Sequence, residues 1–360
     1  MNVGVPKEIK DHEYRVALTP EGASLLVAAG HRVVIEHDAG RAVGLEDAAY
    51  RAAGAEITHD VAAVFACDLI VKVKEPQASE VARFKSGQIL FCYLHLAAAP
   101  ELAKQLAMRG VSAIAYETVT HANGALPLLQ PMSEIAGRLA PQMGAQALHM
   151  AHGGNGVLVT GMPGVAPARI TIIGAGVVGM NATRVAVGLG AHITLLDQQR
   201  DKLAQAETLF GARVETRFST ADSIAESLTH ADIVIGAAQI PGRHAPRLIS
   251  RSLLKLMRTG SALVDVAIDQ GGIAETSRPT THTCPMYIEE GVVHYCVANM
   301  PGAVARTATL TLTQATLPYV RALAALGLAA LDADAGLRSG LQLHAGEIVH
   351  EGLKQEISGC

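Results

Sequence analysis

The segment from residue 169 to residue 197 constrains the fold more than any other part of the sequence. It reads RITIIGAGVVGMNATRVAVGLGAHITLLD, in which a β-branched apolar run leads into Gly174, Gly176 and Gly179. A helical stretch follows, and a second apolar run ends at Asp197. Glycines at this spacing permit a tight turn, a close approach of backbone to a ligand, and close helix–strand packing. The segment therefore predicts a strand–helix–strand unit of a parallel sheet with a phosphate site at the helix N-terminus.

The acidic residue at the end of the second predicted strand indicates which dinucleotide the turn binds. Asp197 is placed to accept hydrogen bonds from the ribose hydroxyls of the adenosine. The 2′-phosphate of NADP would meet a like charge there, so the sequence favours NAD. Arg200 is close enough in sequence to weaken that preference, although its reading as a charge on the helix surface is the stronger one.

Strand and helix patterns alternate through most of the 360 residues. Short strands separated by helices of about ten residues predict βαβ units and parallel sheets that are covered on both faces. A chain of this length is expected to form two domains. We therefore predict an α/β protein with two Rossmann-like, doubly wound parallel-sheet domains and a cleft between them.

The pattern changes near residue 130. PMSEIAGRLAPQMGAQALHMA reads as a longer helix, with Ser133 placed to cap its start. A glycine-rich stretch comes next, and the second alternating series begins at residue 169. After about residue 305 the pattern turns helical to the end, and this tail is compatible with packing on either domain.

Composition and charge exclude several classes of protein. A net charge of −4 and the lack of a basic cluster argue against binding to nucleic acid or to an anionic membrane. The five cysteines are scattered and form no CxxC pair, which favours reduced thiols and predicts no metal site. The N-terminus is charged almost at once, so no signal peptide is expected, and no apolar run approaches the length of a membrane span. These features predict a cytoplasmic protein.

Charged and titratable residues collect where the strands of the first domain are expected to end. Lys72 and Lys74 follow LIV, and His95 follows QILFCYL. Because the carboxyl ends of parallel strands meet at one edge of a sheet, these side chains are expected to lie near one another. Each has an ordinary alternative, with the lysines as snorkelling charges of an edge strand and His95 as a capped surface residue. Arg15, in a charged loop before a helix, is equally compatible with a solvated surface charge.

A dinucleotide beside lysine, histidine, arginine and aspartate suits hydride transfer at a carbon that bears an amine or a hydroxyl. Arginine would bind a carboxylate through two hydrogen bonds. Lysine would polarise a carbonyl or imine, and histidine would activate water. Two later strands, 231–239 and 260–269, would bring Ala238, Gln239 and Asp269 to the cofactor, since ligands bind beyond the carboxyl ends of such strands.

Several segments together resemble one known family. They are VPKEIKDHEYRVALTP, VKVKEP, YLHLA, PMSEIAGRLAPQMGA, PGVAPARITIIGAGVVG, VDVAIDQGG and HYCVANMPGAVART, and they follow the family order from about residue 3 to residue 320. This pattern is similar to that of the L-alanine dehydrogenases. The first segment is shared more loosely with the NAD-binding subunit of proton-translocating transhydrogenase and with saccharopine and lysine dehydrogenases.

The resemblance implies oxidative deamination of L-alanine to pyruvate and ammonia with NAD, and the reverse amination. It implies that Arg15 binds the substrate carboxylate and that Lys74 binds the carbonyl or imine side. His95 would be the general acid–base and Asp269 a second catalytic residue, whereas Lys72 keeps its reading as a rim charge. Besides the three glycines, the resemblance implies these residues for NAD: Ser133, Val177, Val178, Asp197, Lys202, Ser219, Ala238, Gln239, Val266, Ala267, Ile268, Asp269, Val297, Ala298, Asn299 and Met300.

The resemblance also implies a homohexamer and a C-terminal segment that returns to the first domain. The expected domains are therefore 1–128 plus 306–360 for the substrate, and 129–305 for NAD. Two positions depart from the family, which usually has proline where Ala305 stands and commonly serine where Ala308 stands. These departures put local rigidity and cofactor affinity in doubt more than activity.

Two other functions remain open. One is a binding component that carries NAD(H) and hands hydride to a partner, although such a subunit would not need a complete amino-acid site. The other is a dehydrogenase for a larger amino acid such as lysine. The preference for a small substrate rests on the resemblance, and the sequence also leaves open the working direction in the cell.

Overall fold

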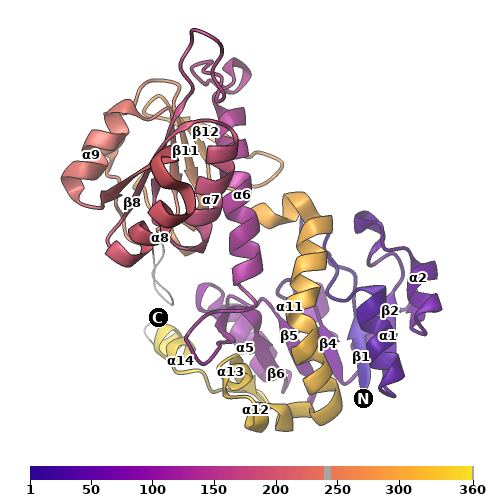
Figure 1. Cartoon of the computed structure of the whole chain (residues 1–360). Helices are drawn as coiled ribbons and strands as arrows, with labels where there is room; N and C mark the ends of the chain where they lie inside the picture. The colour runs from indigo at the N-terminus through magenta and orange to yellow at the C-terminus, as the bar shows by residue number, and fades with distance from the viewer. Residues whose placement is uncertain (239–244, 359–360) are drawn as a thin grey trace. The chain divides into compact units, whose positions relative to one another are not determined.

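The computed structural model describes residues 1–238 and 245–358 of the chain (Figure 1). The chain forms two compact units, one of Met1–Met132 with Val304–Cys360 and the other of Ser133–Ala303. Each unit is an α/β domain built on its own, mostly parallel sheet. This confirms the predicted fold class.

The first unit contains a sheet with the strand order β15-β14-β6-β5-β4-β1-β2-β3. Strands on either side of β1 run parallel to it and continue outward in the doubly wound order. The last two strands are antiparallel and come from the C-terminal segment. The prediction of a wholly helical tail is therefore wrong. The strands of this sheet are β1 (Asn2–Val5), β2 (Arg32–Glu36), β3 (Glu56–Thr58), β4 (Leu69–Val71), β5 (Ile89–Cys92), β6 (Ser112–Ala115), β14 (Leu341–His344) and β15 (Glu347–Ile348).

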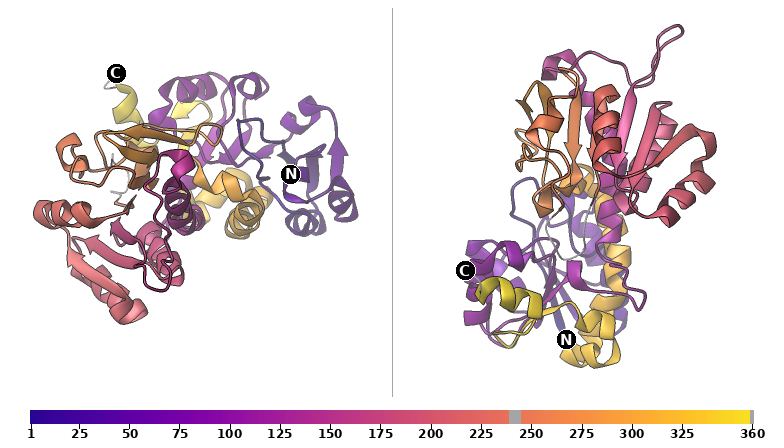
Figure 2. Two further views of the ribbon diagram at one scale, coloured as in Figure 1. Left: turned by 90° about the horizontal axis from the view of Figure 1, so that it is seen from above. Right: turned by 90° about the vertical axis from the view of Figure 1, so that its left-hand side faces the viewer.

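Helices cover this sheet, and the C-terminal segment supplies several of them. The long α11 packs against α1, and α14 packs against the short helix η2 that follows His95 (Figures 1 and 2). Leu353 of α14 joins the core cluster that contains Leu90 and Leu343. The segment that the sequence left unassigned thus completes the first unit. Its helices are α1 (Pro20–Ala28), α2 (Asp47–Ala52), α3 (Val61–Phe65), α4 (Ala78–Val81), α5 (Pro100–Met108), α11 (Ala305–Leu326), α12 (Ala330–Ala333), α13 (Ala335–Arg338) and α14 (Glu351–Ser358).

The second unit contains a sheet with the order β12-β13-β11-β10-β7-β8-β9, which has the same doubly wound arrangement around β7. Only β12, at one edge, is antiparallel to its neighbour among the described strands of this sheet. The strands are β7 (Arg169–Ile173), β8 (His192–Asp197), β9 (Val214–Phe218), β10 (Ile233–Gly236), β11 (Ala262–Asp265), β12 (Met286–Glu289) and β13 (Val292–Tyr295), and the helices are α7 (Val177–Gly188), α8 (Arg200–Phe210), α9 (Ala221–His230) and α10 (Arg251–Leu254).

The long helix that the sequence predicts near residue 130 is α6 (Gln130–Ala147). It begins three residues before Ser133, so this serine lies inside the first turn and is not the cap that the sequence predicted. Gly137 lets α6 approach α7 closely, since a Cβ there would lie 2.3 Å from the carbonyl oxygen of Val178. Arg138 Nε donates to Asn181 Oδ1 at 3.0 Å and links the same two helices.

One helical span in the described part of the chain, Met300–Ala333, is long and apolar enough to cross a membrane by length and composition alone. The expectation that no such run exists is therefore wrong. The core helix of a soluble protein passes the same test, and α11 buries Leu312, Val320 and Leu323 on one face. The finding is weak evidence for a membrane.

Candidate active site

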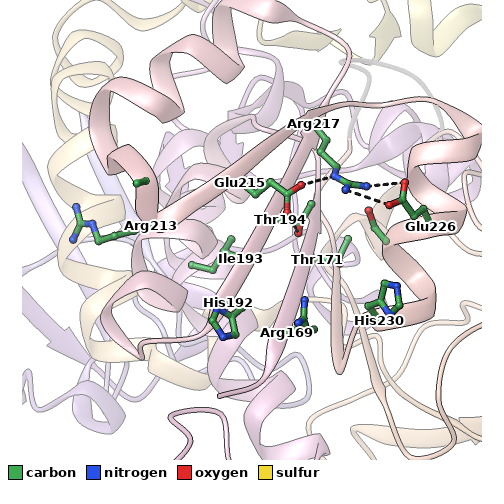
Figure 3. A pocket seen from close by; sticks show the side chains of 12 residues that line it. Arg169, Thr171, His192, Ile193, Thr194, Arg213, Glu215, Arg217, Glu226 and His230 are labelled. Carbon is green, nitrogen blue, oxygen red and sulfur yellow. Dashed lines mark hydrogen bonds and ion pairs between the residues drawn. The ribbon is translucent and has the colours of Figure 1, made fainter. Parts of the chain in front are cut away.

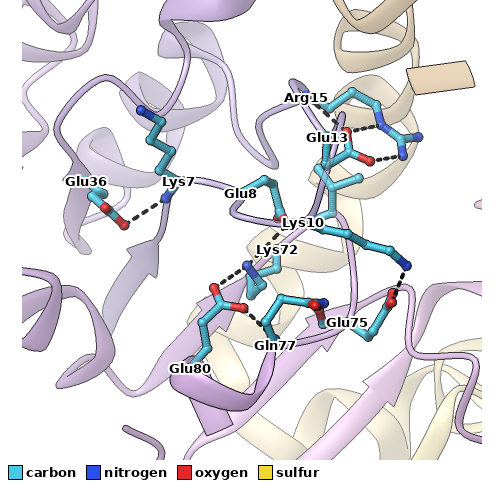
Figure 4. A network of polar contacts seen from close by, with 11 residues as sticks. Lys7, Glu8, Lys10, Glu13, Arg15, Glu36, Lys72, Glu75, Gln77 and Glu80 are labelled. Atoms are coloured by element: carbon cyan, nitrogen blue, oxygen red, sulfur yellow. Dashed lines mark hydrogen bonds and ion pairs between the residues drawn. The ribbon is translucent and has the colours of Figure 1, made fainter. Parts of the chain in front are cut away.

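Arg15 lies in the loop between β1 and α1, and its guanidinium is buried. Its Nε donates to Glu13 Oε1 at 2.7 Å and its Nη2 to Glu13 Oε2 at 2.5 Å (Figure 4). Its Nη1 contacts Met132 Sδ at 3.1 Å. Burial raises the pKa of Glu13, but the hydrogen bonds and charge of Arg15 outweigh it and hold this pKa below its ordinary value. The pair is therefore ionised, and Arg15 is not a solvated surface charge.

Lys72 and Lys74 lie beyond β4, which ends at Val71. The ammonium of Lys72 is fully buried and lies 2.7 Å from Glu80 Oε1 and 3.2 Å from Glu8 Oε2 (Figure 4). Burial lowers the pKa of a lysine, but here the two carboxylates raise it above the ordinary value. The interpretation of Lys72 as a rim charge is therefore wrong, because the residue belongs to a buried ionic network.

Lys74 is half-buried, and its Nζ lies 5.8 Å from the centroid of the Tyr93 ring. Lys74 also adds to the positive charge that lowers the pKa of Glu13. Its neighbour Glu75 pairs with Lys10. The Lys74 ammonium therefore lies near the Tyr93 ring and the ion pair of Glu13 and Arg15, and does not extend freely into solvent.

His95 follows β5 and adopts a left-handed backbone conformation with a φ of 48°. Its backbone N–H donates to Glu117 Oε1 at 2.6 Å, and Leu94 N donates to the same carboxylate at 3.2 Å. The imidazole is 42% exposed, and its Nδ1 lies 3.9 Å from Glu117 Oε1. A positive φ is uncommon for residues other than glycine and occurs more often at functional sites. Glu117, in the short helix Tyr116–Thr118 after β6, thus fixes this turn and leaves the ring accessible.

Tyr93 connects these groups, although no prediction from sequence included it. Its ring stacks nearly parallel to that of His95, with centroids 6.0 Å apart, and it lies beneath Lys74. Its hydroxyl donates to Leu128 O at 2.5 Å. Burial raises the pKa of Tyr93 and the charge of Arg15 lowers it, with a net rise, so the phenol stays neutral. The first unit thus brings together Arg15, Lys74 and His95 around one tyrosine.

The three glycines of the turn in the second unit have different surroundings. Gly174 has a φ of +107°, and a Cβ there would lie 2.7 Å from the carbonyl carbon of Ala237. A Cβ at Gly179 would lie 1.7 Å from Gly174 O, so only glycine permits this helix–strand contact. Gly176, which precedes α7, has open space around its Cβ position. The first helical N–H groups are therefore accessible to an anion.

Asp197 stands at the end of β8, beside the glycine turn. Its Oδ2 accepts a hydrogen bond from Ala175 N at 2.7 Å, and its Oδ1 accepts one from Gln199 N at 2.8 Å. Ser219 lies close to it, since Ser219 N donates to Asp197 O at 3.0 Å. Lys202 lies nearby in the first turn of α8 and is half-buried. The carboxylate is thus fixed in place next to the glycine turn at the start of α7.

The remaining predicted cofactor residues are distributed over the second unit. Asp269 is exposed in the short helix η6 (Val266–Gln270), which follows β11 and also contains Val266, Ala267 and Ile268. Asp265 holds this loop, because its Oδ2 accepts from Ile273 N at 2.7 Å and from Ser277 Oγ at 2.5 Å. Ala238 follows β10, whereas Gln239 lies outside the described residues. The others lie in α6, in α7 and after β13, namely Ser133 in α6, Val177 and Val178 in α7, and Val297, Ala298, Asn299 and Met300 after β13.

A groove of about 250 Å³ lies on one face of the second sheet, and none of these residues lines it (Figure 3). It is lined by polar side chains of β7, β8 and β9 together with α9. Arg217 bridges Glu215 and Glu226 within it. The groove contains none of the predicted site residues, which lie at the carboxyl ends of the strands.

One group in the described part of the chain has the spacing of metal ligands, namely His37, Asp38 and Asp47. His37 Nδ1 lies 2.6 Å from Asp47 Oδ2, and Asp38 pairs with Arg41 at 3.1 Å. Hydrogen bonds and ion pairs thus satisfy this cluster without a metal.

Comparison with known proteins shows the family. The N-terminal domain model of the alanine dehydrogenase/PNT family matches residues 4–136, and its C-terminal domain model matches residues 140–351. An alanine dehydrogenase of Halomonas elongata is 54% identical over 99% of this chain and 96% of that protein. One of Bacillus subtilis is 50% identical over 99% of this chain and 95% of that protein.

Solved structures give the same result. A structure of an L-alanine dehydrogenase superposes with a TM-score of 0.97 at 50% identity and covers 100% of this chain and 99% of the other. A transhydrogenase from Sinorhizobium meliloti superposes with a TM-score of 0.81 at 27% identity, over 98% of this chain and 99% of the other. With both domain models matched in order across nearly its whole length, the chain belongs to the alanine dehydrogenase/PNT family.

Proposed function

We propose that this chain catalyses the reversible oxidative deamination of L-alanine to pyruvate and ammonia, with NAD as the hydride acceptor. The observation that carries the proposal is the grouping of Lys74 and His95 around Tyr93, close to the buried pair of Arg15 and Glu13. This is a set of groups for a small substrate with a carboxylate and a carbonyl or amine. The high identity to named alanine dehydrogenases supports the choice of alanine.

NAD would supply the hydride acceptor, and the second unit has the features to hold it. The open backbone at Gly176 and the close contact at Gly179 suit a pyrophosphate at the start of α7. Asp197 offers its carboxylate to the ribose hydroxyls, which favours NAD over NADP. The resemblance to the alanine dehydrogenases supports further cofactor contacts, namely Ser133, Lys202, Ser219 and the residues after β10, β11 and β13.

Within the first unit, each side chain has a distinct role. Arg15 binds the substrate carboxylate, and Glu13 orients its guanidinium by accepting hydrogen bonds from Nε and Nη2. Lys74 polarises the carbonyl or imine carbon by its positive charge. His95 removes a proton from the water that attacks the imine and returns it to the departing amine. Asp269 of the second unit remains the second catalytic residue on the resemblance.

The assembly and the location of the enzyme are proposed on the resemblance as well. We propose a homohexamer that works in the cytoplasm. Light scattering on the purified protein would give a mass six times that of the chain if the assembly is correct. A monomer at micromolar concentration would contradict it.

NADH formation with L-alanine, L-serine, L-lysine and D-alanine tests the activity, using the wild type and Lys74→Ala. Fast turnover of L-alanine that is much slower, but still measurable, in the variant is the expected result. Turnover of lysine alone would reassign the substrate and leave the fold unchanged. Intact NADH binding with no turnover of any amino acid would favour the hydride-carrying function, which the 27% identity to a transhydrogenase keeps as the second candidate.

A further inference from the structure

The buried network around Lys72 holds the loop that carries Lys74. The ammonium of Lys72 contacts Glu80 Oε1 at 2.7 Å and Glu8 Oε2 at 3.2 Å, and the three side chains are at most 5% exposed (Figure 4). Glu8 lies in the loop after β1, Lys72 follows β4, and Glu80 lies in α4. One cation therefore joins the loop after β1, the end of the neighbouring strand β4, and α4.

Each carboxylate uses its second oxygen to hold the backbone of the same loop. Glu8 Oε1 accepts a hydrogen bond from Val73 N at 2.7 Å. Glu80 Oε2 accepts one from Gln77 N at 2.7 Å and so closes the capping box of α4. The loop from Val73 to Gln77 is thus fastened at both ends, and Lys74 lies between these two points.

The fastening depends on the charge of Lys72. Burial raises the pKa of Glu8, and the charge of Lys72 and the hydrogen bond from Val73 N–H oppose that rise without cancelling it. Without the ammonium, the carboxyl groups of Glu8 and Glu80 would be buried together with no counter-charge, which is costly. The two carboxyl groups would then rearrange, so the hydrogen bonds that they accept from Val73 N and Gln77 N would weaken.

We propose that Lys72 is a positioning residue. It holds Glu8 and Glu80, which fasten the two ends of the loop from Val73 to Gln77, and so orients Lys74 towards the substrate. The inference rests on the proposed role of Lys74 as a substrate ligand. Lys72 itself is buried and touches no reacting atom. Its removal would displace the Lys74 side chain, and a displacement of about 1 Å is enough to slow the reaction of a bound substrate.

The decisive comparison is between Lys72→Met and Leu343→Ala in the complete enzyme. Leu343 is fully buried in the core cluster of the same unit and lies in β14, so its truncation destabilises the unit without touching the loop. Glu80→Gln is a second test. Glu80 uses one oxygen for Lys72 and the other for Gln77 N–H, and glutamine would replace one of these two oxygens with an NH₂ group, which cannot accept. Lys74→Ala reports the direct role of the ligand.

We expect Lys72→Met to raise the KM for pyruvate at least about ten-fold and to lower kcat at 25 °C, with the KM for NADH unchanged. Leu343→Ala should lower the melting temperature and leave the KM for pyruvate unchanged. Glu80→Gln should give an intermediate increase. Hydrogen exchange of the peptide that spans residues 73–77 should accelerate in Lys72→Met and not in Leu343→Ala.

The outcomes separate the two proposals. If Lys74→Ala raises the KM for pyruvate but Lys72→Met does not, the positioning role is wrong and the proposed function stands. If Lys74→Ala itself leaves this KM unchanged, the proposed function of Lys74 is wrong and the inference fails with it. Unchanged exchange at residues 73–77 in Lys72→Met would overturn the clamp whatever the kinetics show.

Discussion

The carboxylate of Glu13 spans the guanidinium of Arg15, with Nε 2.7 Å from Oε1 and Nη2 2.5 Å from Oε2, and neither side chain is more than 1% exposed. Only one residue separates them in the sequence. The same carboxylate also accepts the backbone N–H of Arg15 at 3.1 Å. The pair therefore fixes the orientation of the arginine before any substrate arrives, which is the pre-organisation that carboxylate recognition requires.

We expect Glu13→Gln to lower the free energy of unfolding by about 3 kcal/mol, because it leaves the Arg15 cation buried without its counter-charge. Urea unfolding of both proteins at neutral pH measures the difference. The control is Glu56→Gln, because Glu56 holds Arg32 with similar geometry but both side chains are half-exposed. That change should cost less than about 1 kcal/mol. Equal effects of the two substitutions would show that burial is not the cause.

The stabilisation by Glu13 should also depend on pH. The pKa of this carboxyl is lowered in the folded state from its ordinary value of 4.5, so the unfolded chain binds the proton more tightly. The contribution is therefore complete above the unfolded pKa and is lost as the pH falls through the lower, folded pKa. The difference in stability between wild type and Glu13→Gln should be constant from pH 6 to 8 and should shrink in acid. A difference that grew on acidification would contradict the assigned direction.

Gly179→Ala should abolish NADH binding, whereas Gly188→Ala in the same helix should not. A Cβ at Gly179 would overlap the carbonyl oxygen of Gly174, so the helix start and the glycine turn must move apart. Gly188 has open space around its Cβ position, and alanine there should stabilise α7 by about 0.5 kcal/mol. Titration of NADH fluorescence measures both variants. Binding by Gly179→Ala at wild-type affinity would show that this contact does not shape the site.

The two lysines after β4 show where prediction from sequence succeeds and where it fails. Two cations that follow a buried strand indicate charged groups at the carboxyl edge of the sheet. The sequence could therefore place Lys72 and Lys74 near one another. It could not tell them apart, because the partners of Lys72 are Glu8 and Glu80, and side-chain pairing between distant segments has no local pattern. Tyr93 was missed for a related reason, since an aromatic residue in an apolar run is expected in the core.

The sequence predicted the two sheets correctly, but it did not predict the start of α6 or the strands of the C-terminal tail. Alternating periodicity and the glycine spacing identify both doubly wound sheets because these signals are local. The start of α6 was wrong by several residues, since Gln130 begins the helix and Ser133 lies within it. The two short strands of the tail, Leu341–His344 and Glu347–Ile348, were missed because the first pairs with β6 and the second with the first, so both depend on tertiary contact and not on local propensity.

His95→Asn should reduce kcat by about 10²- to 10⁴-fold, the usual contribution of a general acid–base, with the KM for NADH unchanged. Asparagine is the matched replacement because it tolerates the left-handed conformation that His95 adopts, with a φ of 48°. Loss of activity would then reflect the missing imidazole and not a distorted turn. Steady-state kinetics with pyruvate, ammonium and NADH measure the effect. A variant that kept more than a tenth of wild-type kcat would remove His95 from the proton transfer.

The oxidative direction should quicken as pH rises above neutral, because hydride can leave only from the neutral amine of alanine. An ammonium nitrogen has no lone pair with which to form the imine. Arg15 stays charged across this range, since the carboxylate of Glu13 raises its pKa above the ordinary value despite its burial, so substrate binding should change little. Initial rates with L-alanine and with alanine deuterated at Cα, from pH 7 to 10, measure both the trend and whether hydride transfer limits the rate. A flat profile with a full isotope effect would show that the enzyme binds and deprotonates the ammonium form itself.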